Sequence, residues 1–329
     1  METNTVNASA IKKNNSVHMS DFPIISRDSL SASERQLLDK IRFTIIGAQK
    51  GGTTWLSDIL NTHKDIHIPD RKELHFYNQR PHYSQGVEWY LDNFKEHNGQ
   101  NVLGEATPNY MWNVATPEEY ASEEGELLFD VAPRMRALIP EVKLIICLRD
   151  PVERAISSYY HQVTRGRLSP LKTLRDQMHT HGILSMSHYD QHLETWFEEF
   201  PQEQFHVLIF EEDIRPDKNK LATVDAVCDF IGVERMGDQP ILYERSNEKH
   251  DPLLAYIRQM PFVRFANVTD ENRDPIADRL ARALSRRAPD WIQRMVEIKI
   301  TDEDRDALRE ALQPDHDRLE SMLGRKLPW

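Results

Sequence analysis

The chain has 329 residues, of which 39% are hydrophobic and 29% are charged, and these values are typical of a globular protein large enough for a sizeable α/β domain. Its formal net charge of −12 argues against a general nucleic-acid-binding protein, which would present a basic stripe. No apolar run approaches the roughly 20 residues that a membrane helix needs, so the sequence predicts no integral membrane segment.

Two features predict the compartment in which the protein works. The N-terminus lacks a basic region followed by an apolar core, so no signal peptide is expected. The two cysteines, Cys147 and Cys228, each lie in an apolar run, which is typical of buried free thiols in a reducing compartment. Together these features predict a cytoplasmic protein.

The beginning of the chain differs in character from the rest. Its first residues are polar, rich in Asn and Ser and without periodicity, which predicts a flexible segment. A short helix is expected over residues 31–41, because Ser31 and Glu34 have the spacing of a capping box. We therefore expect a flexible N-terminal arm over residues 1–35 and a single domain over residues 36–329.

Residues 43–56 combine a β-branched strand, a turn with two adjacent glycines and a helix that begins at two threonines. Adjacent glycines let the backbone approach an anion closely. Unpaired N–H groups at a helix start point at such an anion, and the helix dipole favours negative charge there. Lys50 adds a mobile positive charge, and the threonine hydroxyls add donors. These features predict a phosphate-binding loop, and a plain strand–turn–helix junction is the alternative.

The position of the lysine separates this loop from the Walker A loop of kinases and nucleotide hydrolases. In that loop the lysine directly follows the last glycine, and the next Ser or Thr holds magnesium. Here Thr53 follows Gly52, and Lys50 lies two residues before Gly52. The spacing favours a different phosphate-bearing donor, while a small-molecule kinase stays open as an alternative.

A second candidate anion site follows the most apolar run of the chain. The run over residues 143–148 predicts a central parallel strand that is buried on both faces. Arg149 follows it directly, and Asp150 and Pro151 are residues that commonly begin a helix. Ser157 lies about two turns into that helix, on the face that can look back toward its start. An arginine fork and a hydroxyl that converge there predict a site for a second phosphate.

Both motifs resemble those of the sulfotransferases that use 3′-phosphoadenosine 5′-phosphosulfate (PAPS). The order Lys-Gly-Gly-Thr-Thr-Trp over residues 50–55 resembles their 5′-phosphosulfate loop, and Arg-x-Pro-x-x-Arg-x-x-Ser over residues 149–157 resembles their 3′-phosphate motif. The chain is most similar in pattern to heparan sulfate N-sulfotransferase-like enzymes and bacterial sulfotransferases, over residues 41–235 and 301–329. The resemblance implies an α/β protein with the P-loop-like sulfotransferase fold, in which helices cover both faces of a mostly parallel central sheet.

The resemblance also implies roles for individual residues. Lys50 would stabilise charge on the oxygen that leaves the sulfuryl group, and Arg149 and Ser157 would hold the 3′-phosphate. The backbone amides from Gly51 to Thr54 would hold the 5′-phosphate, and Trp55 would stack on adenine. The cofactor-binding residues implied in this way are Lys50, Gly51, Gly52, Thr53, Thr54, Trp55, Arg149 and Ser157. The cofactor would be PAPS, the product adenosine 3′,5′-bisphosphate, and no metal is required.

The catalytic base is expected within residues 72–94, which look like the region after the phosphosulfate loop in the same enzymes. Glu73 matches the glutamate that is the proposed general base in that family. Other sulfotransferases use a histidine, which makes His75 its rival. The expected catalytic residues are therefore Lys50, Glu73 and His75.

A loop over residues 106–112 follows a predicted strand over residues 101–105, and loops after parallel strands carry ligand contacts in open α/β sheets. It resembles the segment that lines the acceptor side in the family. The aromatic residues of this region either fit a sugar, a lipid head group or an aromatic compound, or pack on the core. They are Phe76, Tyr77, Tyr83, Trp89, Tyr110 and Trp112.

Residues 242–250 stand where family members carry a basic and often glycine-containing cofactor loop. This chain has no glycine there, and Arg245 and Lys249 are interleaved with Glu244 and Glu248. Cofactor contacts from these two basic residues are therefore left open.

The sequence thus predicts an enzyme that moves a sulfuryl group from PAPS to a hydroxyl or amine of a small-molecule, lipid or carbohydrate acceptor by in-line displacement. Two alternatives stay open. A P-loop small-molecule kinase predicts ATP turnover that depends on magnesium. A non-catalytic adenosine-bisphosphate-binding protein predicts nucleotide binding without transfer. No nucleic-acid partner is expected, and homo-oligomer formation is left open.

Overall fold

The computed structural model describes residues 22–71, 73–97, 99–113, 127–243, 252–259 and 299–329, together with a few isolated positions between 279 and 289. The chain forms two compact units, each built from two separate segments. Unit 1 comprises Met1–Leu148 and Gln191–Glu244, and unit 2 comprises Arg149–Asp190 and Arg245–Trp329.

Unit 1 is organised around a five-stranded sheet in which all paired strands run parallel. The strand order is β2-β3-β1-β4-β5. The strands are β1 (Ile41–Gly47), β2 (Ile66–His67), β3 (Val102–Ala106), β4 (Lys143–Leu148) and β5 (Phe205–Ile209). β1 and β4 are buried along nearly their whole length, which their apolar residues on both faces allow. The predicted parallel sheet is confirmed.

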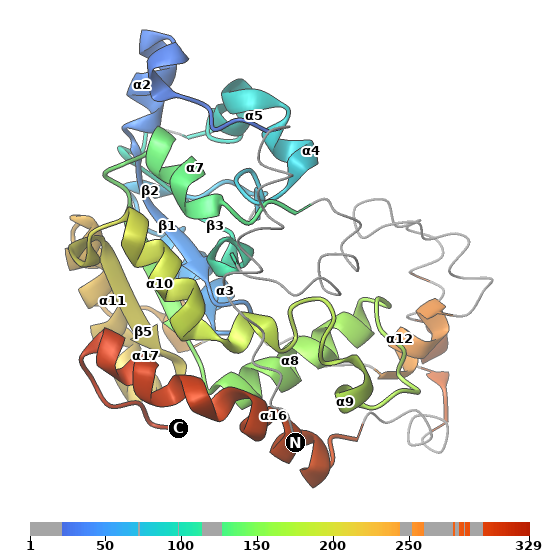
Figure 1. Ribbon diagram of the computed structural model, residues 1–329. Coiled ribbons are helices and arrows are strands. Elements are labelled where there is room, and N and C mark those ends of the chain that lie inside the picture. The colour runs from blue at the N-terminus through green and yellow to red at the C-terminus, as the bar shows by residue number, and fades with distance from the viewer. Residues whose placement is uncertain are drawn as a thin grey trace. The chain divides into compact units, whose positions relative to one another are not determined.

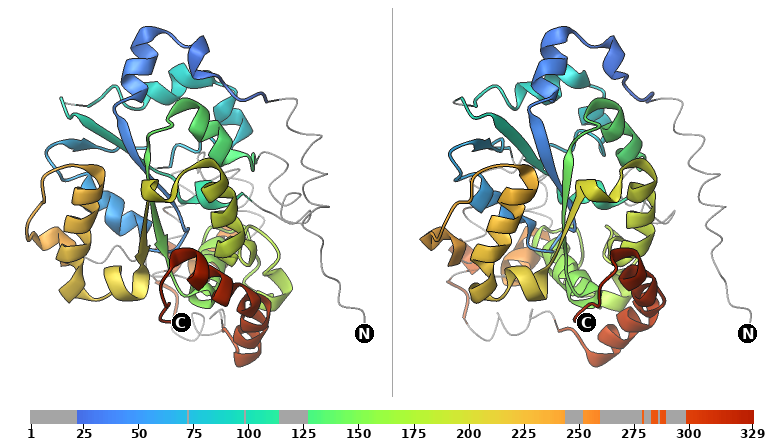
Figure 2. Two further views of the ribbon diagram at one scale, coloured as in Figure 1. Left: turned by 60° about the vertical axis from the view of Figure 1, so that its left-hand side comes forward. Right: turned by 90° about the vertical axis from the view of Figure 1, so that its left-hand side faces the viewer.

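Helices cover both faces of this sheet (Figures 1 and 2). α3 (Thr53–Leu60) and α11 (Asp217–Ile231) pack on one face, where they share a core with β1 and β4. α7 (Val131–Leu138) and the part of α10 (Tyr189–Glu199) that belongs to unit 1 lie on the other face. The remaining elements of unit 1 are η1 (Arg27–Ser29), α2 (Ala32–Leu38), α4 (Arg80–Tyr83), α5 (Gly86–Asp92), η2 (Pro108–Met111), η4 (Gln202–Gln204), η5 (Phe210–Ile214) and η6 (Pro240–Tyr243).

Residues 22–35, which lie within the segment expected to be an arm, include η1 and the start of α2 and are assigned to unit 1. α2 begins at the capping box that the sequence predicted. The Ile25 amide donates a hydrogen bond to the Tyr83 hydroxyl at 2.9 Å, so this segment is fastened to α4. Such a long-range contact leaves no trace in local composition, so a polar sequence alone does not reveal it. Residues 1–21 lie outside the described residues.

The described part of unit 2 is organised around α8 (Pro151–Thr164). The Asp150 carboxylate caps this helix by accepting hydrogen bonds from two backbone amides of the first turn at 2.8 and 3.0 Å, as its sequence predicted. Apolar side chains of α8 pack against Leu308 and Leu312 of α16 (Asp302–Leu312). The other elements of this unit are α9 (Leu174–Gln177), η3 (Ser185–Ser187), α12 (Pro252–Gln259), η7 (Gln313–Asp315) and α17 (His316–Leu323).

Candidate active site

The loop between β1 and α3 is shaped by two glycines and a lysine. Gly52 begins α3 with φ of 100°, and Lys50 has φ of 69°, a conformation that few residues other than glycine adopt. A Cβ on Gly51 would lie 2.0 Å from the Cys147 carbonyl oxygen, so glycine is required there. The Ala48 amide donates to the same carbonyl at 3.0 Å. The lysine loop is thereby fastened to β4.

The amides of this loop fall into two sets. The Gly51 N–H donates to the Ala48 carbonyl oxygen at 2.9 Å and so closes the turn. The amides of Gly52, Thr53 and Thr54 stand at the start of α3, where N–H groups have no partner within the helix. Together with Lys50 they form the part of the predicted site that suits an anion.

Trp55 lies in the core of unit 1. Its side chain is 6% exposed, and the indole N–H donates to the Leu242 carbonyl oxygen at 3.0 Å. This geometry does not support the expected stacking of Trp55 on adenine, because core neighbours already cover the indole ring. The side chain instead connects α3 to η6.

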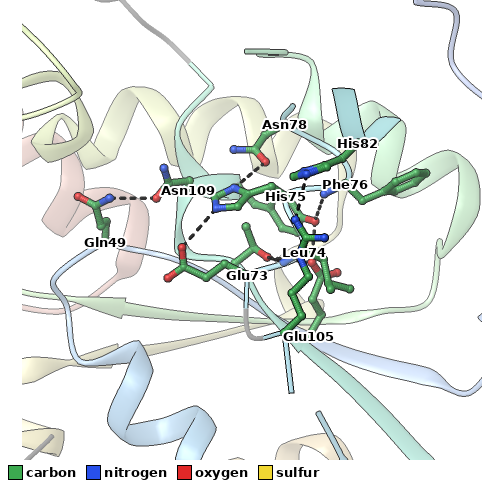
Figure 3. Close-up of polar contacts among 12 residues, drawn as sticks. Gln49, Glu73, Leu74, His75, Phe76, Asn78, His82, Glu105 and Asn109 are labelled. Atoms are coloured by element: carbon green, nitrogen blue, oxygen red, sulfur yellow. Dashed lines mark hydrogen bonds and ion pairs between the residues drawn. The ribbon is translucent and has the colours of Figure 1, made fainter. Parts of the chain in front are cut away.

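The two candidate bases contact each other (Figure 3). Glu73 Oε2 lies 3.3 Å from His75 Nε2, and His75 Nδ1 lies 3.2 Å from Asn78 Oδ1. The Glu73 side chain is 50% exposed and that of His75 is 17% exposed. The carboxylate is therefore accessible to another molecule, whereas both nitrogens of the imidazole are engaged.

The hydrogen bonds of Glu73 and His75 determine how many protons the two side chains share. When Nδ1–H of His75 donates to the Asn78 carbonyl oxygen, Nε2 of the neutral imidazole carries a lone pair. A hydrogen bond between Nε2 and the Glu73 carboxyl then needs one proton, carried by either partner. The pair can therefore hold one proton between them, and the more exposed Glu73 is the member that can meet an acceptor.

A buried carboxylate lies behind the candidate bases. Glu105, in β3, is fully buried and accepts hydrogen bonds at 2.6–2.8 Å from the hydroxyls of Tyr90, Thr107 and Tyr110. Burial raises the pKa of Glu105, and the three hydroxyls oppose that rise because they stabilise the carboxylate. Burial and the charge of Glu105 also raise the pKa of Tyr90 and Tyr110 well above the ordinary range, so both phenols stay protonated as donors.

Two of these hydroxyls connect Glu105 to the backbone on both sides of His75. The Thr107 oxygen accepts the Leu74 amide at 3.1 Å, and the Tyr110 oxygen accepts the Phe76 amide at 2.9 Å. His75 itself has φ of 54°, a left-handed conformation that its flanking contacts hold in place. The network therefore sets the position of both candidate bases.

The aromatic residues expected at the acceptor side are mostly internal. Phe76 stacks on Tyr90 with ring centroids 4.6 Å apart, and Tyr77 packs edge-to-face on Tyr110 at 5.4 Å. Phe76, Tyr77, Tyr83, Tyr110 and Trp112 are each at most 4% exposed, while Trp89 is half-buried. Of the two alternatives left open by the sequence, these rings therefore take the second and pack in the core.

Two amide side chains connect the lysine loop to η2. Gln49, next to the lysine, donates to Asn109 Oδ1 at 3.2 Å (Figure 3). η2 also carries Tyr110, the residue whose hydroxyl holds the backbone beside His75. The bond therefore ties the candidate anion loop to the support of the candidate bases.

In unit 2, Arg149 and Ser157 line one pocket of about 390 Å³. The convergence of these two side chains, expected from their spacing on α8, is therefore present. The Tyr189 hydroxyl donates to the Arg149 carbonyl oxygen at 2.9 Å and fixes the backbone where α8 begins. Other residues that line the pocket are Glu153, Ile156, Tyr160, Ile300 and Arg305.

Sequence reasoning missed three contributors to these sites. Glu105 and Tyr110 match a Glu-x-x-x-x-Tyr segment that lines the acceptor side in the family, but the sequence analysis assigns Glu105 no supporting role. A carboxylate inside an apolar strand is costly unless hydrogen-bonded, and that signal could have marked it. Asn78 and Arg305 gave no local signal, because their contacts depend on the fold. Arg245 and Lys249, whose role was left open, lie outside the described residues.

Within the described residues, no group of three or more His, Cys, Asp and Glu side chains is arranged to hold a metal ion. In the same part of the chain, no helix combines the length and the apolar character needed to cross a membrane.

Comparisons with known proteins consistently find similarity to sulfotransferases. A family model described as a sulfotransferase domain matches residues 40–272. Heparan sulfate glucosamine 3-O-sulfotransferase 3B1 of Homo sapiens is 30% identical over 225 residues, which cover 66% of this chain and 51% of that protein. Membrane-associated sulfotransferase kil1 of Dictyostelium discoideum is 34% identical over 145 residues, which cover 42% of this chain and 27% of that protein. The chain thus spans about half the length, or less, of these curated relatives.

A solved structure shares the fold. The crystal structure of a sulfotransferase from Alicyclobacillus acidocaldarius matches with a TM-score of 0.56 at 22% identity, and the match covers 87% of this chain and 97% of that one. The expected α/β fold with a parallel central sheet is therefore confirmed.

Proposed function

The chain belongs to the sulfotransferase family, and we propose that it transfers a sulfuryl group from PAPS to a hydroxyl or amine of an acceptor. The observation that carries the proposal is that each unit holds one feature suited to an anion. The Lys50 loop follows β1 in unit 1, and the pocket lined by Arg149 and Ser157 belongs to unit 2. A donor that bears phosphate at both its 5′ and 3′ positions needs two such features.

The residues at these features fit PAPS in their chemistry. The amides at the start of α3 and the Lys50 ammonium suit the 5′-phosphosulfate. The planar guanidinium of Arg149 and the hydroxyl of Ser157 suit the 3′-phosphate. When bound, PAPS supplies the sulfuryl group, and adenosine 3′,5′-bisphosphate is the product. Lys50 stabilises the negative charge that develops on the oxygen from which the sulfuryl group departs.

Glu73 takes the proton of the acceptor in this proposal. Its carboxylate is half exposed, whereas His75 is held by hydrogen-bonding groups at both nitrogens. His75 therefore orients the carboxylate and shares the proton that Glu73 receives. His75 as the sole base is the competing assignment.

The acceptor is a small molecule, a lipid or a carbohydrate that carries a hydroxyl or an amine. Heparan sulfate is named for the human relative, and a carbohydrate is one candidate class here. The net charge of −12 weighs against a long polyanionic acceptor. The cytoplasmic location stays a prediction, and both cysteines being free and buried supports it.

Calorimetric titration of the full chain tests the proposed donor. Adenosine 3′,5′-bisphosphate and ATP are compared, first without metal and then with magnesium. We expect tight metal-independent binding of the bisphosphate and a loss of roughly 10- to 100-fold in affinity in Arg149→Ala, as for the removal of a charged hydrogen-bonding group. Preferential binding of ATP with magnesium, unchanged by Arg149→Ala, would support the kinase alternative instead.

A further inference from the structure

The pocket of unit 2 contains a cation that the two phosphate motifs do not account for. Arg305, in the first turns of α16, lines the same pocket as Arg149 and Ser157. Its contact with Glu153 of α8 joins residues that are 152 positions apart in the sequence. A side chain brought to a phosphate-type pocket from so far away is a candidate ligand.

The backbone that carries Arg305 is held firmly. Thr301 and Asp304 form a capping box at the start of α16. Asp304 is 2% exposed and also accepts the Arg175 amide at 3.1 Å. Leu308, three residues after Arg305 and therefore on the same side of the helix, is fully buried in the core shared with α8. Arg305 thus reaches the pocket from a fixed position.

One carboxylate stands between two guanidinium groups in this pocket. Glu153 forms an ion pair with Arg305 through Oε1, and its Oε2 lies 3.9 Å from Nη2 of Arg149. The three side chains are between 22% and 38% exposed, so these ion pairs contribute little to folding stability. A guanidinium carries five N–H donors in a planar fork, so it can contact a carboxylate and a phosphate at the same time. Two positive charges and one negative charge leave this trio with a net charge of +1, which favours an anionic ligand.

We propose that Arg305 binds the 3′-phosphate of PAPS together with Arg149 and Ser157, and that Glu153 is the counter-ion that keeps the two arginines together before the phosphate enters. The assignment rests on the proposed function. A phosphate accepts paired hydrogen bonds from arginine forks, and a dianion is better neutralised by two guanidinium groups than by one. Arg305 would thereby supply a second cation for this phosphate, in a chain whose residues 242–250 interleave their basic side chains with Glu244 and Glu248.

Titration with two nucleotides that differ by one phosphate tests the assignment. The full chain, Arg305→Ala and Arg305→Lys are each titrated with adenosine 3′,5′-bisphosphate and with adenosine 5′-monophosphate. Arg305→Ala is expected to lose roughly 10- to 100-fold in affinity for the bisphosphate and less than about twofold for the monophosphate. Arg305→Lys keeps the charge without the fork, so its loss is expected to be intermediate.

A matched control lies one helical turn further on. Arg309 of the same helix pairs with Asp306 at 2.8 Å and is 60% exposed, so Arg309→Ala changes the charge of α16 without altering the pocket lining. The affinity of the Arg309→Ala variant for both nucleotides should equal that of the unaltered chain. Thermal unfolding of every variant establishes that each is folded.

Three results would overturn the assignment. If Arg305→Ala binds the bisphosphate as tightly as the unaltered chain while Arg149→Ala does not, Arg305 is no ligand and the proposed function stands. If Arg305→Ala weakens both nucleotides equally, or Arg309→Ala matches it, the effect is not local to the 3′-phosphate. If the unaltered chain does not bind the bisphosphate, the proposed function fails along with the assignment.

Discussion

Glu73 and Arg149 are charged side chains that are held in place by opposite means. Behind Glu73, a fully buried carboxylate, Glu105, is satisfied by three hydroxyls, two of which hold backbone amides beside His75. Around Arg149, partly exposed side chains form ion pairs, and the backbone is held mainly by apolar packing of α16 on α8.

The two arrangements suit different tasks: one fixes the position of a catalytic base, and the other allows a ligand to bind. A buried, satisfied network has one favourable arrangement, because breaking any bond leaves a polar group without water. Such a network suits a base, whose proton transfer requires a fixed position. Exposed ion pairs contribute little to stability and can exchange partners. They suit a phosphate pocket, in which a ligand has to replace an internal counter-ion.

The largest expected effect comes from removing the base. Glu73→Gln should lower kcat by roughly 10²- to 10⁴-fold, because the amide cannot accept the acceptor's proton. His75→Asn should cost less, since it removes only the group that orients Glu73. Initial rates of sulfated product formation, measured side by side, give both values. Near-full turnover in Glu73→Gln, with turnover abolished in His75→Asn, would reverse the assignment of the base.

Variants of two tyrosines can separate the effect of the Glu105 network on the position of the candidate bases from its effect on folding stability. The Tyr110 hydroxyl bridges Glu105 and the Phe76 amide, whereas the Tyr90 hydroxyl donates to the other oxygen of Glu105. Both Tyr→Phe variants should lose about 1–3 kcal/mol of unfolding free energy.

Only Tyr110→Phe should also lower kcat, by roughly tenfold, with little change in the KM for PAPS. Denaturant unfolding and steady-state kinetics measure the two effects independently. Equal losses of kcat in both variants would show that the network contributes only to stability.

The buried carboxylate should also give a pH signature. Burial raises the pKa of Glu105 above its unfolded value, so the stability that this group contributes is fully present below the unfolded pKa and is lost as the pH rises through the folded pKa. The advantage in Tm of the unaltered chain over Glu105→Gln should therefore shrink from acidic toward neutral pH. Thermal unfolding at a series of pH values measures it, and an advantage that grows with pH would mean that the three hydroxyls outweigh burial.

The smallest expected effect concerns the counter-ion of the pocket. Glu153→Gln removes a negative charge beside the proposed phosphate site, while its carbonyl oxygen can still accept from an arginine. Binding of adenosine 3′,5′-bisphosphate should tighten about threefold and become more sensitive to salt. Weaker binding in this variant would show that holding the arginines in place matters more than the charge of Glu153.

Local signals in the sequence predicted the elements that bear the site. The apolar run over residues 143–148 became β4, and the capping residues at Ser31 and Asp150 begin helices as expected. The lysine loop follows a parallel strand, as its glycines indicated. These features depend on residues within a few positions of one another, which is why a single sequence reveals them.

What the sequence could not reveal depends on contacts between distant segments. The Glu105 network joins the backbone at Leu74 and Phe76 to residues about 30 positions later, and only the paired strands bring them together. The burial of Trp55 in the core shared by α3 and α11 likewise depends on segments far apart in the sequence. Arg305 meets Glu153 only because α16 packs on α8.

Product analysis with the sulfuryl donor tests the central claim most directly. The unaltered chain and Lys50→Ala are incubated with PAPS and a panel of monosaccharides, phenols and amines without metal, and release of adenosine 3′,5′-bisphosphate is followed. In parallel, ATP with magnesium is offered with the same panel. The account predicts acceptor-dependent release of the bisphosphate, roughly 10²- to 10³-fold slower in Lys50→Ala, and no ATP turnover. Magnesium-dependent formation of ADP, with PAPS left intact, would contradict it.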